Sequence, residues 1–158
     1  MISNVGVIVH RGKAYVPTYA KMTGEMAGAY LTIEPIYVTN LTLDELTETL
    51  ERVVAAGNPE VPTPTREELE RYYSRLLLRA AGVRSWRQLA REGASYGIGW
   101  LNNQIELTMS RLDKQGRWEI DPTKTRYFPR DTDIRTIVEA ILQDVRSRPE
   151  LLASDTKP

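Results

Sequence analysis

The segment Ser95–Phe128, SYGIGWLNNQIELTMSRLDKQGRWEIDPTKTRYF, decides the fold. Its apolar residues Ile105, Leu107 and Met109 alternate with polar ones, which is the period-two pattern of a half-buried antiparallel strand. Turn-forming residues divide the segment into pieces of hairpin length, at Asn102-Asn103, Asp113–Gly116 and Pro122–Lys124. The segment therefore predicts three or four consecutive strands.

An amphipathic helix is predicted directly after these strands. Asp131 or Asp133 stands where a helix cap is needed, and apolar residues then recur at helical spacing, at Ile134, Ile137, Val138, Ile141 and Val145. The first third of the chain has the same order in a looser form. Strands are expected over Val5–Val9, Lys13–Tyr19 and Ala29–Val38, followed by a helix from Thr42 to Gly57 with a Thr42–Glu45 capping box.

Residues 58–94 read as a helical insert between these two units. Pro59, Pro62 and Pro64 form a stiff connector, and capping boxes at Thr65–Glu68 and Ser85–Gln88 begin one helix to Gly82 and another ending near Gly93. We therefore expect an α+β fold in a single domain 1–148, in which two strand-strand-strand-helix units, 1–57 and 95–148, form either two antiparallel sheets or one strongly bent sheet.

Two weaker features complete the predicted architecture. Pro35 lacks a backbone donor, so we expect it at a sheet edge or bulge, and the glycines of Ala20–Gly28 indicate a loop. From Pro149 the composition becomes polar, which predicts a flexible tail over 149–158 with disorder from Ala153 to Pro158.

Composition excludes several kinds of chemistry. The 158 residues include no cysteine, which rules out disulfides, iron–sulfur clusters and thiol catalysis and fits a cytoplasmic protein. Met1–Gly12 has no basic segment followed by a long apolar core, so we expect no secretory signal, and no apolar run has the length of a membrane span. His10 is the only histidine, and beside the Arg11-Gly12 turn it is expected to be a surface or strand-end residue. We therefore expect no enzyme and no cofactor.

Carboxylates are the remaining candidates for catalysis or metal binding. Glu119 and Asp121 share one strand face beside Arg117 and could hold a hard cation, although a solvated sheet face has the same pattern. The segment Gly97-Ile98-Gly99 lacks the third glycine of a dinucleotide fingerprint. A small hydrolase with carboxylate chemistry is the third hypothesis, and no residue is assigned to catalysis, cofactor or metal.

The 21 basic and 21 acidic residues cancel overall but are unevenly spread. Arg71, Arg75 and Arg79 recur every four residues, and aromatic side chains that could stack on bases accompany them, at Tyr72, Tyr73, Trp86, Trp100 and Trp118. Against nucleic-acid binding, Glu67, Glu68 and Glu70 dilute the stripe and the pI is about 6.6. A single-stranded nucleic-acid-binding domain is the alternative hypothesis. The acidic and basic segments could equally be two helices packed within one fold.

Several segments carry a family resemblance: Ser85–Leu89, Gly99-Trp100, Gly116–Ile120 and Tyr127–Pro129, followed by Ile137–Leu142. Over about residues 1 to 146 the chain resembles the immunity proteins of bacterial contact-dependent growth inhibition systems, in the group compared with Whirly single-stranded-DNA-binding domains. The resemblance implies a non-catalytic protein that binds and neutralises a cognate toxin domain. Its first candidate contact is the acidic helical face of Asp44, Glu48 and Glu51, and an exposed strand edge for β-augmentation is the second.

Overall fold

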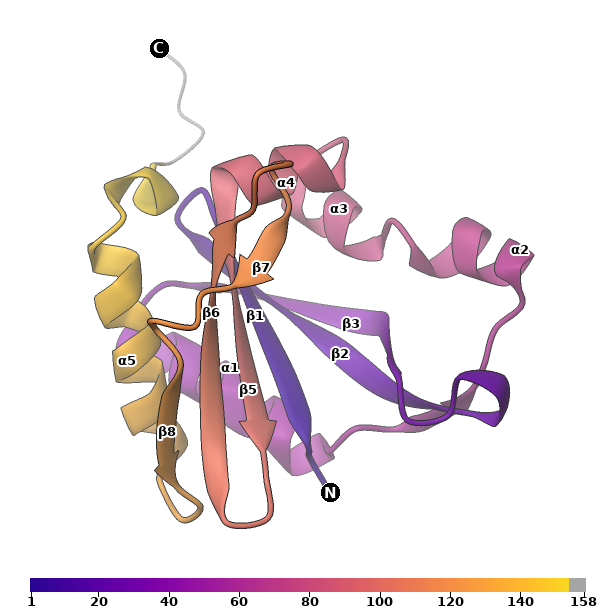
Figure 1. Cartoon of the computed structure of the whole chain (residues 1–158), viewed down its shortest axis with the longest axis horizontal. Coiled ribbons are helices and arrows are strands. Elements are labelled where there is room, and N and C mark those ends of the chain that lie inside the picture. The colour runs from indigo at the N-terminus through magenta and orange to yellow at the C-terminus, as the bar shows by residue number, and fades with distance from the viewer. Residues whose placement is uncertain (154–158) are drawn as a thin grey trace.

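The computed structural model describes residues 1–153, and its centre is one eight-stranded sheet (Figure 1). The strands lie in the order β3-β2-β1-β5-β6-β7, with β4 beside β2 and β8 beside β6. Their bounds are β1 Asn4–His10, β2 Lys13–Thr23, β3 Tyr30–Asn40, β4 Glu60–Pro62, β5 Gly93–Trp100, β6 Gln104–Leu112, β7 Trp118–Ile120 and β8 Arg126–Pro129. The α+β class and the strands predicted within Ser95–Phe128 are confirmed; β7 and β8 both pair with β6, at its two ends.

The helices begin where the sequence places polar caps. Their bounds are α1 Leu43–Ala56, α2 Arg66–Glu68, α3 Leu76–Ala81, α4 Trp86–Glu92 and α5 Ile134–Arg146, with a π-helical turn η2 at Leu69–Tyr73 and 3-10 turns η1 at Gly24–Met26 and η3 at Pro149–Leu152. Thr42, Thr65, Ser85 and Asp133 each accept a hydrogen bond from a first-turn amide. A complete capping box also needs the third helical residue to accept from the backbone amide of the cap, and this bond forms only at Thr65–Glu68 among the three predicted boxes. Glu45 instead accepts from the Thr42 hydroxyl, and Gln88 accepts from the Arg84 amide.

The two predicted strand-strand-strand-helix units join into one sheet, which is one of the two arrangements expected. β1 pairs antiparallel with β5, from Asn4 opposite Gly99 to His10 opposite Gly93. Outward from this central pair, β1 is followed by β2 and β3 on one side, and β5 is followed by β6 and β8 on the other, so each unit contributes three strands in the same order. α1 and α5 contact each other and cover one face, where they enclose the larger core, which includes Val7, Val9, Leu46, Leu50, Tyr96, Ile98, Leu107, Ile137 and Ile141.

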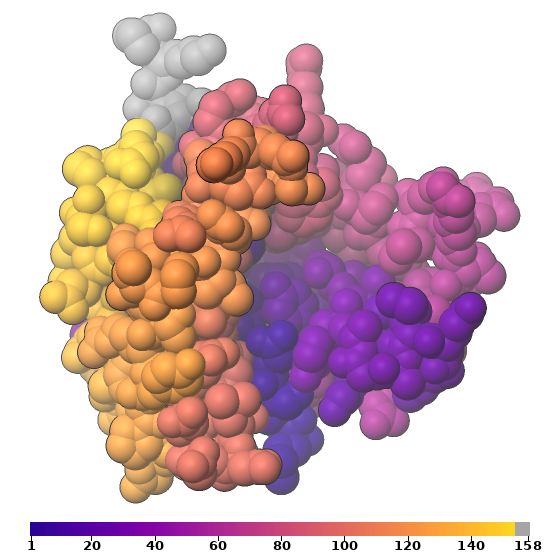
Figure 2. Space-filling model, viewed as in Figure 1, coloured from indigo at the N-terminus to yellow at the C-terminus, as the bar shows by residue number. Residues whose placement is uncertain are grey.

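The insert covers one end of the opposite face. Ile8 and Tyr15 project to that side and pack with α3, α4 and Val83 in a second core, which includes Leu77, Leu78, Ala81 and Leu89. Within residues 1–153 no helix covers the rest of this face, and Figure 2 shows it hollowed between β5–β6 and the β2–β3 hairpin. The fold thus leaves a concave part of the sheet open.

Three local predictions differ from the structure. β2 continues through the predicted loop to Thr23 because β3 and β4 pair with its end. The helix expected from Thr65 to Gly82 is broken by η2 and by Arg75, whose φ of −115° is not helical. Leu151, expected in a flexible tail, is 2% exposed and its carbonyl accepts from the Gly12 amide. Disorder predicted for residues 154–158 lies outside the described residues.

The prediction for Pro35 is confirmed. It lies in β3, the terminal strand of the sheet, where the pairing register with β2 shifts between Pro17 and Thr18. A missing backbone donor is tolerated at a bulge in an edge strand, because no ladder hydrogen bond depends on it.

Across residues 1–153, no helix has the length and apolar character needed to cross a bilayer.

Candidate functional site

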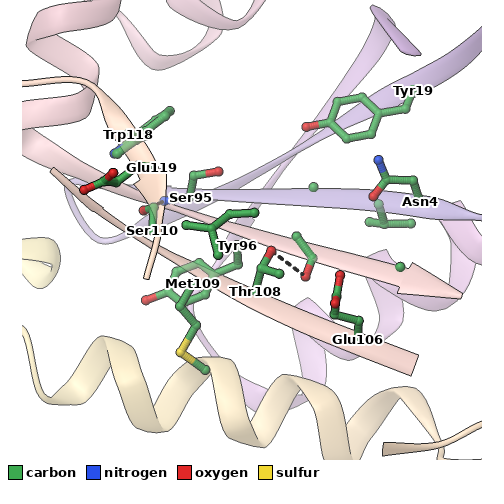
Figure 3. Close-up of a pocket in the computed structure, with 15 residues that line it drawn as sticks. Asn4, Tyr19, Ser95, Tyr96, Glu106, Thr108, Met109, Ser110, Trp118 and Glu119 are labelled. Atoms are coloured by element: carbon green, nitrogen blue, oxygen red, sulfur yellow. Dashed lines mark hydrogen bonds between the residues drawn. The ribbon is translucent and has the colours of Figure 1, made fainter. Parts of the chain in front are cut away.

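The open face of the sheet contains a trough whose floor is made of glycine. Strand alternation directs the side-chain positions of Gly6 on β1 and of Gly97 and Gly99 on β5 to this face, and Gly6 lies directly opposite Gly97. Without side chains there, the floor is backbone, and the trough above it has a volume of about 410 Å³ (Figure 3). This volume is within the range of small-ligand and anchor-residue pockets.

Polar side chains surround the glycine end of the trough. Asn4 and Glu106 flank Gly99 on the neighbouring strands, and Thr108 lies beside Gly97, whose carbonyl accepts from its hydroxyl at 3.4 Å. Tyr19 reaches over from β2, and its hydroxyl lies against Gly6, facing the trough in Figure 3. Burial raises the pKa of Tyr19, so this hydroxyl stays protonated and able to donate.

Glu106 is a carboxylate at this end, and within the described residues no lysine or arginine forms an ion pair with it. Its hydrogen bond and its charge raise the pKa of neighbouring Tyr127 on β8. At the other end, Trp118 donates to the Gly93 carbonyl at 3.4 Å, and Glu119 is held by Arg111 at 3.1 Å. The charge available to a ligand is therefore concentrated at Glu106.

A ligand in the trough would lie across a face of the sheet. At Gly97 and Gly99, β5 pairs with β1 on one side and β6 on the other, so a ligand there would contact glycine Cα atoms and the surrounding polar side chains. β1 pairs with β5 along its length but with β2 only at Ile8–His10. Among residues 1–153, no three histidine, aspartate or glutamate side chains gather closely enough to hold a metal ion. The geometry fits recognition of a donor-rich group by Asn4, Glu106 and Thr108.

The acidic face predicted on α1 is solvent-exposed but partly neutralised. Asp44, Glu48 and Glu51 are all exposed on the helix that covers the opposite face of the sheet. Asp44 forms an ion pair with Arg135 of α5 at 2.8 Å, which leaves Glu48 and Glu51 as the charges available to a partner. For the predicted strand edge, the structure offers β3 at one end of the sheet and β7 and β8 at the other.

The arginine stripe does not form a regular helical row. A row at four-residue intervals needs an unbroken α-helix, whereas Arg71 lies in the π-helical turn, Arg75 at the break and Arg79 in α3. Arg71 stacks over the ring of Tyr72, and Arg75 donates to the Arg84 carbonyl at 3.0 Å. Of the predicted stacking residues, Tyr72 and Trp86 are 55% and 48% exposed, whereas Trp100 and Trp118 pack against the two cores.

The residues considered for metal binding or catalysis do not form a common site. Glu119 and Asp121 both contact Arg111, while Arg117 pairs with Asp113 at 3.2 Å, so the predicted trio does not form. His10 is at a strand end as predicted, but it is 1% exposed rather than on the surface. Its Nε2 lies 2.9 Å from Glu92, and this hydrogen bond is the main cause that lowers the pKa of Glu92.

Sequence reasoning missed the trough. Gly97 and Gly99 were visible only as an incomplete nucleotide fingerprint, although glycine at alternate positions of a strand also predicts a bare patch on one face. That Gly6 lies opposite Gly97 depends on the β1–β5 pairing, which joins residues about ninety positions apart.

Comparison with known proteins finds resemblance in structure only. No protein-family model matches the chain, and no curated protein matches it. A protein of unknown function from Neisseria meningitidis has a TM-score of 0.61 and 16% identity over 91% of this chain and 94% of that one. A chain of the CdiA-CT/CdiI toxin and immunity complex from Yersinia pseudotuberculosis has a TM-score of 0.60 and 17% identity, over 92% and 96%. At these identities the likeness shows a shared fold.

Proposed function

We propose that this protein is an immunity protein, which binds a cognate bacterial toxin domain and neutralises it without catalysis. The observation that carries the proposal is the fold shared along nearly the whole length with a chain of a toxin and immunity complex. A match from end to end supports a comparable role better than a match to one motif.

The surfaces of the molecule are consistent with binding a protein. The α1 face offers Glu48 and Glu51, and the trough on the other side offers a concave surface with Glu106 at one end. Both are acidic, which favours a toxin domain with a basic surface, because complementary charge speeds encounter and selects the partner. β3, a terminal strand of the sheet, is a further candidate contact through β-augmentation where α3 and η2 do not pack against it.

Co-expression tests the proposal directly. The toxin domain encoded by the gene immediately upstream is induced in bacteria with and without this protein, and survival is scored. We expect survival only when both are made, and no protection from the toxin domain of the Yersinia complex, since contact surfaces differ at 17% identity. Cell death despite soluble protein, or an upstream gene that encodes no toxin domain, would contradict the proposal.

The α1 contact has its own test. Replacing Glu48 and Glu51 by lysine reverses two exposed charges without touching the Asp44–Arg135 pair, so we expect the fold to be retained and toxin association to slow by at least about tenfold. Glu25→Lys with Glu60→Lys makes the same change at exposed positions on η1 and β4 and is the matched control. Equal association rates for both double variants would remove α1 from the interface.

The nucleic-acid alternative is tested with fluorescent single-stranded oligonucleotides. Salt-dependent binding that is lost in Arg75→Glu would favour it.

A further inference from the structure

Gly99 has no structural reason to be glycine, unlike its neighbours on the trough floor. A Cβ at Gly6 would overlap the Tyr19 hydroxyl, and one at Gly97 would lie 2.7 Å from the Thr108 hydroxyl oxygen. A Cβ at Gly99 would meet nothing within 4 Å, and its backbone is not in the left-handed region. Glycine in a strand interior lowers stability and is typical of places where another molecule approaches closely.

The space above Gly99 is surrounded by groups that accept hydrogen bonds. Asn4 and Glu106 flank it on β1 and β6, with Thr108 and the Tyr19 hydroxyl beyond (Figure 3). None of the residues that line the trough is lysine or arginine, and Glu106 has no cationic partner among the described residues. A ligand group with a positive charge and several hydrogen-bond donors would therefore complement the site.

From these observations we infer that the trough receives an arginine side chain presented by the protein partner. A guanidinium group is flat, carries five donors and forms paired hydrogen bonds with a carboxylate, so it suits Glu106 over a floor of exposed peptide planes. It also stacks on aromatic rings, and Tyr19 supplies one at the wall. A lysine ammonium would use fewer of these acceptors.

The rim of the trough favours a macromolecular source for this arginine. Ile120, which lines the trough, is 59% exposed, and Tyr127 beside Glu106 is 56% exposed. Apolar and aromatic side chains around an acidic pocket resemble the surroundings of an arginine anchor in protein interfaces. The inference rests on the proposed function for the identity of the partner, but the trough can be tested without a toxin.

The first experiment uses blocked tripeptides, acetyl-Gly-X-Gly-amide, titrated into the 15N-labelled full chain and followed by NMR. With X as arginine we expect shifts at the amides of Gly6, Gly97 and Gly99, at a dissociation constant on the order of 1 mM for so small a ligand. Lysine should bind at least about threefold more weakly, and uncharged citrulline should cause no shift. Equal binding of arginine and citrulline, or shifts confined to other surfaces, would overturn the inference.

Variants then separate loss of the site from loss of the fold. Gly99→Val fills the trough where no atom stands in the way, so we expect an unchanged or higher melting temperature together with loss of arginine binding. Glu106→Gln should weaken arginine binding by about tenfold, whereas Glu139→Gln, which removes an exposed charge on α5, should not. A folded Gly99→Val variant that binds arginine as tightly as wild type would exclude the trough as the arginine-binding site.

The same variant distinguishes this inference from the proposed function. If the wild-type chain protects cells from the co-expressed toxin and Gly99→Val does not, both stand. If Gly99→Val protects as well as wild type, the protein remains an immunity protein and the trough is not its contact.

Discussion

At the scale of single residues, Asp144 is the best-connected buried charge in the described chain. Its carboxylate accepts from Tyr96 at 2.6 Å and from Lys124 at 2.8 Å, and Arg148 lies 3.3 Å away. Burial by itself raises the pKa of Asp144, but the hydrogen bonds from Lys124 and Tyr96 and the charge of Arg148 outweigh it, and the pKa lies below its usual value. The ionised carboxylate therefore stabilises the folded state.

Asp144→Asn should lower the free energy of unfolding by about 2 kcal/mol at pH 7, because both cations lose their shared partner. Because the pKa of Asp144 is lower in the folded than in the unfolded chain, its ionised carboxylate stabilises the fold at pH values above the unfolded pKa, near 4. This stabilisation is lost as the pH falls below that value and the carboxylate is protonated. The gap between wild type and Asp144→Asn should thus narrow from pH 5 to pH 3 in urea titrations. Asp131→Asn, at an exposed position, is the control. A stability difference between wild type and Asp144→Asn that stays constant from pH 5 to pH 3 would contradict a stabilising ionised Asp144.

Thr47 gives a prediction of opposite sign. Its hydroxyl oxygen is buried on α1 and has no hydrogen-bond partner among the described residues. Thr47→Val keeps the shape and removes the unpaired polar atom, so we expect the free energy of unfolding to rise by about 1 kcal/mol and the melting temperature by about 3 °C. Thr49→Val on the same helix, at a less buried position, should change little in the same thermal scan. A destabilised Thr47→Val would show that the hydroxyl is satisfied.

At the scale of elements, the insert contains a segment held by few contacts. No residue of α2 or η2 is buried, whereas α3 buries Leu77, Leu78 and Ala81. Local opening needs little energy where little apolar surface is covered, so amides of Arg66–Tyr73 should exchange with deuterium at least about a hundredfold faster than those of α3. Equal protection of the two segments would contradict this prediction.

The C-terminal turn η3 offers a matched pair of side chains. Leu151 is 2% exposed in the larger core, and its neighbour Leu152 is 45% exposed. Leu151→Ala should lower the free energy of unfolding by about 3 kcal/mol, as other buried leucines do, and Leu152→Ala by less than about 0.5 kcal/mol. Urea unfolding of the two variants decides whether the folded unit extends to Leu152. Equally small changes in the free energy of unfolding for both variants would support the predicted end of the folded domain at residue 148.

At the scale of the whole molecule, the β1–β5 pair and the α1–α5 contact tie the two units together. We therefore predict one cooperative unfolding transition. All three tryptophans lie in the insert and second unit, and because the chain has no cysteine, a dye on Val38→Cys, at an exposed site of β3, reports the first unit. The urea midpoints of tryptophan and dye fluorescence should coincide. Two separate midpoints would mean that the units unfold independently.

The whole molecule also places its candidate contacts on opposite sides. α1 covers one face of the sheet, and the trough lies on the other. A toxin that used both would have to extend around an edge of the sheet, so the Glu48, Glu51 and Gly99 variants separate two distinct modes of binding.

The sequence by itself determined the strands of Ser95–Phe128, the caps at Thr42, Thr65, Ser85 and Asp133, and the order of two similar units around an insert. These features depend on alternation, capping and turn chemistry within a few residues, which are local in the chain.

Only the tertiary structure decided that the two units share one sheet, that His10 and Leu151 are buried, and that three glycines meet on one open face. Each of these depends on which distant strand pairs with which and in what register, and a shift of one residue would turn every side chain to the other face. That choice is made by the packing of the whole chain, because no short stretch contains both partners.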